Sequence, residues 1–73
     1  MPYLTKFEKI RVLGARATQI SNGAPSTVDA TGLTDARSIA KKELRENKLP
    51  LVIQRIYPDG TIVEIPVVEM TAR

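Results

Sequence analysis

The segment from Thr5 to Pro25 carries complete start and stop signals for one long helix. Thr5 followed three residues later by Glu8 is the pattern of a capping box, in which each side chain accepts a hydrogen bond from the other residue's backbone N–H. Asn22, Gly23 and Pro25 mark the end, because Gly tolerates the left-handed conformation after a helix and Pro cannot continue one. Whatever else the chain forms must therefore bury a face of this helix.

At 100° per residue, the segment has two faces that are poorly suited to water. The broader one, which we expect to face the core, consists of Phe7, Ile10, Leu13, Gly14, Ala17 and Ile20. Val12 and Ala15 lie opposite it, beside Gln19. Two such faces predict a helix held between two bodies, its own domain and a partner.

Gly14 is unusual because it lies in the middle of the expected helix. Glycine there costs on the order of 1 kcal/mol relative to alanine. Such a cost usually indicates that another group approaches the backbone closely. That group belongs either to the same domain or to a partner, and the residues alone leave both open.

The remainder of the chain predicts a second helix followed by a hairpin. Thr34 is the expected cap of a helix that runs to about Asn47 or Lys48, and Pro50 prevents its continuation. Residues 51–57 and 61–67 are rich in β-branched side chains and flank the turn sequence Pro58-Asp59-Gly60, with Pro66 expected at a sheet edge. A short extended piece is expected near residues 26–29. The predicted fold class is α+β, with two main helices joined by a loop and a C-terminal β-hairpin.

Length and composition limit what this chain can be. Its 73 residues make one domain at most, expected over residues 1–73, and a domain of this size buries only about 60% of its unfolded surface. The sequence has no Cys and no His, which removes disulfides, thiolate metal sites and the commonest acid–base and metal-binding group. We therefore expect no catalytic residue, no metal and no cofactor, and we expect a partner to stabilise the fold. No apolar run of about 18 residues and no apolar leader occur, so neither membrane insertion nor secretion is expected.

A net charge of +3 raises the question of nucleic-acid binding. Residues 1–22 carry four basic and one acidic side chain, and residues 34–48 carry five basic and three acidic ones. Basic and acidic residues interleave along the sequence, which argues against one phosphate-binding face, and the chain has only three aromatic residues for base stacking. A small basic module that binds nucleic acid directly is the alternative hypothesis.

Glu43 falls on the apolar face of the second expected helix, beside Ala40 and Leu44. A carboxylate in such a place needs a cation or several hydrogen-bond donors. The expected partner is Arg16 or Arg55, in a structural ion pair rather than a catalytic site.

Several short motifs occur in a fixed order along the chain. They are Thr5-Lys6-Phe7-Glu8, then Arg11, Leu13, Gly14, Arg16, Ala17, Gln19 and Ile20, then Gly23-Ala24-Pro25, and further on Leu33-Thr34, Ile39-Ala40, Glu43-Leu44, Leu49-Pro50, Ile53, Arg55 and Pro58-Asp59-Gly60. In this order the motifs closely resemble the small assembly subunit of cellular RNA polymerases. That family includes bacterial omega, archaeal subunit K and the common subunit of the eukaryotic nuclear polymerases, and this chain looks closest to the archaeal and eukaryotic members.

The resemblance implies a non-catalytic subunit that clamps the largest polymerase subunit and promotes assembly and stability of the enzyme. In archaeal and eukaryotic relatives it also lies near the docking site of the polymerase stalk. It implies a hetero-oligomer without membrane contact that meets nucleic acid only through the complex, while catalytic Mg²⁺ and nucleotides belong to the large subunits. The implied location is cytoplasmic for an archaeal source, and nuclear, viral-factory or virion for a eukaryotic or viral one.

The resemblance and the helix pattern together give a set of expected partner-binding residues. They are Arg11, Val12, Gly14, Ala15, Arg16, Ala17, Gln19, Ile20 and Arg55. The first helix is expected to divide into residues that hold the domain together, Phe7, Ile10, Leu13 and Ile20, and residues that face the polymerase, Val12, Ala15, Arg16 and Gln19.

Overall fold

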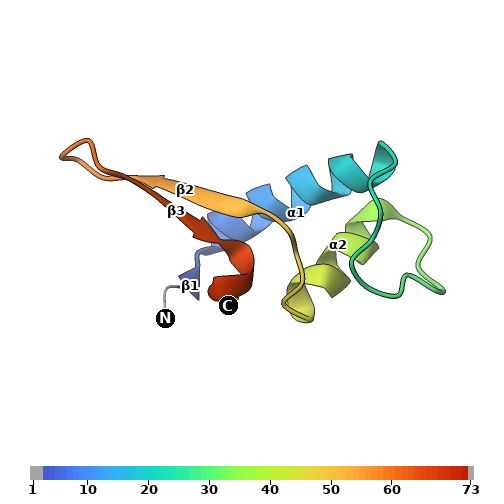
Figure 1. Cartoon of the computed structure of the whole chain (residues 1–73). Helices are drawn as coiled ribbons and strands as arrows, with labels where there is room; N and C mark the ends of the chain where they lie inside the picture. Colours follow the sequence, from blue (N-terminus) through green and yellow to red (C-terminus); the bar gives the residue numbers. More distant parts are fainter. Residues whose placement is uncertain (1–2, 73) are drawn as a thin grey trace.

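The computed structural model describes residues 3–72 (Figure 1). In chain order the elements are β1 (Tyr3–Leu4), α1 (Lys6–Ser21), α2 (Ala36–Arg45), β2 (Val52–Ile56), β3 (Ile62–Pro66), the 3-10 helix η1 (Val67–Glu69) and β4 (Thr71–Ala72). Two helices followed by an antiparallel hairpin confirm the α+β prediction. The extended piece expected near residues 26–29 is not a strand, because residues 27 and 28 form a bend.

The start of α1 follows its sequence signals. The Thr5 hydroxyl accepts from the Glu8 backbone N–H at 3.2 Å, and the Glu8 carboxylate accepts from the Thr5 N–H at 3.0 Å, so the capping box is formed. Gly23 follows the helix with a φ of +100°. The helix α2 starts one residue later than predicted, since Asp35 and not Thr34 is its N-cap residue. It ends at Arg45, and Asn47 then takes a φ of 60°, a conformation that asparagine tolerates well.

The hairpin formed by β2 and β3 extends away from the helices (Figure 1). The strands pair antiparallel, with Ile53 opposite Ile65 and Arg55 opposite Val63. These residues are half-buried, whereas Gln54 and its neighbours on the other face are exposed, as the two-residue period of a strand requires. The fold is consequently elongated, with a longest dimension of 45 Å.

The hydrophobic core combines the two helices with both ends of the described chain. Its buried members are Leu4, Val12, Leu13, Ala40, Leu44, Leu49, Val67 and Met70. A short parallel pairing of β1 with β4, in which Tyr3 lies opposite Thr71, closes the fold. No pattern in the sequence predicts this pairing.

The inward face of α1 differs from the expected one. Phe7 and Ile10, expected in the core, are 78% and 53% exposed, whereas Val12 is only 4% exposed. Val12 joins the expected Leu13 in the core cluster, and the expected Ile20 packs against that cluster. The prediction was wrong because α1 has apolar residues on two faces, and periodicity alone cannot tell which face meets the rest of the domain.

Candidate functional site

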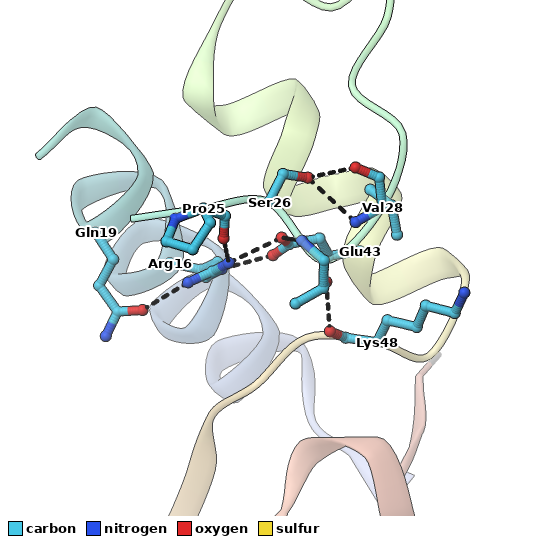
Figure 2. Close-up of polar contacts among 8 residues, drawn as sticks. Arg16, Gln19, Pro25, Ser26, Val28, Glu43 and Lys48 are labelled. Atoms are coloured by element: carbon cyan, nitrogen blue, oxygen red, sulfur yellow. Dashed lines mark hydrogen bonds and ion pairs between the residues drawn. The ribbon is translucent and has the colours of Figure 1, made fainter. Parts of the chain in front are cut away.

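A buried ion pair joins α1 to α2. Arg16 Nε donates to Glu43 Oε1 at 2.6 Å, and Arg16 Nη2 donates to Glu43 Oε2 at 2.9 Å (Figure 2). Arg16 is 4% exposed and Glu43 is fully buried. Of the two partners expected for Glu43, the structure supplies Arg16. Such a two-pronged contact depends on the planar guanidinium, which a lysine could not replace.

Further hydrogen bonds attach the loop after α1 to this pair. Arg16 Nη2 also donates to the Pro25 carbonyl at 2.8 Å, and Arg16 Nη1 donates to Gln19 Oε1 at 3.1 Å. The Thr27 backbone N–H donates to Glu43 Oε2 at 2.9 Å. Among residues 3–72, no buried side-chain nitrogen or oxygen lacks a hydrogen-bond partner. The pair therefore fixes both helices and the loop in one arrangement.

The charges of this pair are stable at neutral pH. Burial pushes the pKa of Glu43 upward, but hydrogen bonds from Arg16 and Thr27 outweigh that effect and hold the pKa below its usual range. The hydrogen bond to Glu43 in turn raises the pKa of Arg16. A carboxylate that is held ionised in this way is suited to a structural role and not to proton transfer near pH 7.

A second ion pair joins the start of α1 to the hairpin. Arg55 Nε donates to Glu8 Oε2 at 2.9 Å, and Arg55 Nη2 donates to Glu8 Oε1 at 2.8 Å and to the Tyr3 carbonyl at 3.0 Å. Arg55, expected at a partner surface, is half-buried and engaged inside the domain. The hydrogen bond from Arg55, followed by the one from the Thr5 backbone, lowers the pKa of Glu8 to about 2.

Replacing Glu8 with Gln should lower the free energy of unfolding at pH 7 by about 1–2 kcal/mol, because the cap and the ion pair both lose a charge. The pKa of Glu8 is about 2 in the fold against an ordinary 4.5. Its contribution is therefore complete above about pH 4.5 and disappears as the pH falls toward 2. Denaturant unfolding at pH 7 and near pH 2 should show the gap between wild type and Glu8→Gln closing.

The control for this prediction is Glu46→Gln, which removes a carboxylate 3.9 Å from Lys42 at the surface. An exposed pair of this kind contributes about 0.5 kcal/mol or less. A gap for Glu8→Gln that is the same at both pH values would show that the charge of Glu8 does not stabilise the fold.

An apolar stripe runs along the outside of α1, and its two large side chains are exposed. Phe7 and Ile10 are followed at helical spacing by the half-buried Gly14 and Ala17, and we call these four residues the outer stripe. A Cβ atom added at Gly14 would meet no atom within 4 Å. Packing inside the described domain therefore does not explain the glycine.

The expected partner-binding residues lie in three kinds of surroundings. Arg11, Ala15 and Gln19 are exposed, Gly14, Ala17, Ile20 and Arg55 are half-buried, and Val12 and Arg16 are buried. The expectation that Val12 and Arg16 face outward does not hold in this structure, because Val12 belongs to the core cluster and Arg16 binds Glu43. Phe7 and Ile10 are the surface residues that the sequence analysis assigned to the core.

Two further kinds of site can be checked directly. Within residues 3–72, no three His, Cys, Asp or Glu side chains cluster as metal ligands. None of the helices there is long and apolar enough to cross a membrane.

Comparison with known proteins identifies polymerase subunits. A protein of Saccharomyces cerevisiae named DNA-directed RNA polymerases I, II, and III subunit RPABC2 is 54% identical over 69 residues, which cover 94% of this chain and 44% of that protein. The Schizosaccharomyces pombe protein of the same name is 49% identical, with 94% of this chain and 49% of that protein covered. The Arabidopsis thaliana protein DNA-directed RNA polymerases II and V subunit 6B is 47% identical, with 93% and 47% covered. This chain thus spans about half the length of these relatives.

A family model also matches, namely RNA polymerase Rpb6, over residues 2–51. The matched range contains both helices, the Arg16–Glu43 pair and the outer stripe. With more than half of the chain matched and close relatives along nearly all of it, this chain belongs to the RNA polymerase Rpb6 family.

Proposed function

We propose that this chain is a non-catalytic subunit of a multisubunit DNA-dependent RNA polymerase and that it binds the largest subunit through the outer stripe of α1. Relatives along nearly the whole chain carry the names of RNA polymerase subunits. The single observation that carries the binding site is the exposure of Phe7 and Ile10 beside a glycine with open space above it.

The chemistry of the outer stripe suits close packing against another protein. A large aromatic side chain that becomes buried in a partner contributes about 1.5–3 kcal/mol from its apolar area. Gly14 lets a partner's backbone or side chain come near the helix axis, which a larger residue would prevent. Exposed Arg11 lies beside the stripe and is a secondary contact in this proposal.

The buried pair Arg16–Glu43 makes the domain rigid, and this rigidity supports its proposed role in assembly. Because it fixes α1 against α2 and the loop, the outer stripe is presented on a rigid body and little ordering is needed on binding. A rigid body that binds only the assembled surface of the large subunit stabilises the assembled state by its own binding free energy. Assembly is promoted in this way without any catalytic group.

Co-expression with the polymerase subunits of the source organism tests this proposal. The tagged wild-type chain should retain the largest subunit through purification. Ile10→Glu should lose it while keeping its helical circular dichroism, because the substitution places a charge in the outer stripe. The matched control is Gln54→Glu, which adds the same charge at an exposed position of the hairpin and should retain the subunit. Retention by both variants would contradict the outer stripe as the binding site, and no retention by wild type would contradict the function.

A further inference from the structure

The helix α2 carries a row of basic side chains on its solvent face. Arg37, Lys41 and Arg45 are all exposed, and we call them the basic row. Their spacing of four residues keeps them on one side of the helix, with about 6 Å of rise between neighbours. The row is therefore about 12 Å long.

The acidic side chains of α2 point elsewhere. Glu43 is buried against Arg16, and Glu46 lies beside Lys42 on another side of the helix. Asp35 precedes the helix, and the pKa of its carboxyl is lowered chiefly by a hydrogen bond with Ser38 and least by the charge of Lys41. No member of the basic row forms a salt bridge within residues 3–72. Basic and acidic residues that interleave in the sequence are thus separated in space on this helix.

We propose that the basic row binds the phosphate backbone of double-stranded nucleic acid without reading its sequence. One strand of a duplex carries a phosphate every 3.4 Å along the axis, so a row of about 12 Å runs beside about three or four phosphates. Guanidinium and ammonium groups both suit phosphate oxygens. The site lies on a different helix from the outer stripe and does not depend on the proposed contact with the largest subunit.

Two observations favour a duplex over other anions. No aromatic residue lies in α2, so the row offers no platform for the stacked bases of a single strand. Protein interfaces usually have an apolar centre depleted in charged residues. The position beside the row on this face is Ser38, which is polar, so an acidic protein surface would find no apolar centre here.

Binding of a fluorescent 20-base-pair DNA duplex to the full chain of 73 residues tests the proposal, with anisotropy followed in KCl solutions from low to moderate concentration. Three phosphate contacts give a slope of log affinity against log salt of about −2.7, so affinity should fall about 40-fold when the salt rises fourfold. Arg37→Gln with Lys41→Gln should flatten that slope by about two. The matched control, Lys6→Gln with Arg11→Gln, removes the same charge from exposed positions of α1 and should change the slope far less.

Circular dichroism establishes that each variant keeps its helices. If the double variant of the basic row loses helix, the single variant Arg45→Gln decides the question, with an expected flattening of the slope by about one. Equal losses from the α1 and α2 double variants would overturn the basic row as a site. Tighter binding of polyglutamate than of duplex at the same salt would also overturn it, because the row would then be a docking face for an acidic protein.

Discussion

Glu43→Ala should lower the free energy of unfolding by about 3–5 kcal/mol, because it leaves the buried guanidinium of Arg16 without its counter-charge. Arg16 is only 4% exposed, so water cannot solvate its guanidinium in place of Glu43. A folded chain of 73 residues has a total stability of about 4–11 kcal/mol. The variant should therefore lose a large share of the stability of the free chain, and urea titration followed by helical circular dichroism measures the loss.

The double variant Arg16→Met with Glu43→Leu separates the cost of an unpaired charge from the cost of losing the pair. Replacing a whole buried pair by apolar residues is often nearly neutral. Here the Pro25 carbonyl and the Thr27 N–H also lose their partners, so a residual loss of about 1–3 kcal/mol is expected. If the double variant is as unstable as Glu43→Ala, the loss of stability comes from the hydrogen bonds to the loop. That result would contradict the claim that an unpaired charge destabilises Glu43→Ala.

The elements that can be predicted well are those determined by residues close together in the sequence. Thr5 and Glu8 form the capping box because both signals lie within one helical turn. The turn at Pro58 to Gly60 forms for the same reason, with Gly60 at a φ of +91°. The strands β1 and β4 are each two residues long and lie near opposite ends of the chain. They are too short to show a periodic pattern in the sequence, so they could not be predicted.

The orientation of α1 could not be predicted because a distant contact decides it. Arg16 reaches Glu43, which is 27 residues away in the sequence, and this pair turns Val12 and Leu13 inward. Once they face the core, Phe7 and Ile10 face outward. The structure reverses the expected places of Phe7, Ile10 and Val12, whereas Leu13 is buried and Ile20 packs against the core, as expected.

The separation of charges on α2 illustrates a similar limit. A count along the sequence mixes Arg37, Lys41 and Arg45 with three acidic residues and predicts no basic face. Helical spacing of four residues separates the row from the acids, and the contacts of Glu43 with Arg16 and of Glu46 with Lys42 hold those acids on other sides. The helical spacing of the charges, not their number, creates the basic row.

Phe7→Ala should weaken binding to the largest polymerase subunit by about 30-fold or more, the effect of losing about 2 kcal/mol at an aromatic anchor. The same change should alter the free energy of unfolding of the free chain by less than about 0.5 kcal/mol, because Phe7 is 78% exposed there. Titration of the purified large subunit and urea unfolding of the free chain measure the two effects separately. If Phe7→Ala strongly destabilises the free chain, Phe7 packs inside the domain. That result would contradict the outer stripe as the binding site.

Gly14→Ala provides a second test, in which the stability of the free chain should rise while binding to the large subunit should weaken. With no atom within 4 Å of the new methyl group, alanine should stabilise the free helix by up to about 1 kcal/mol. Binding should nevertheless weaken if a partner packs against the helix at this point, because the methyl group occupies the space that the partner needs. Greater stability with weaker binding is an outcome that a purely structural role for Gly14 cannot produce, whereas unchanged binding would mean that no partner comes close to it.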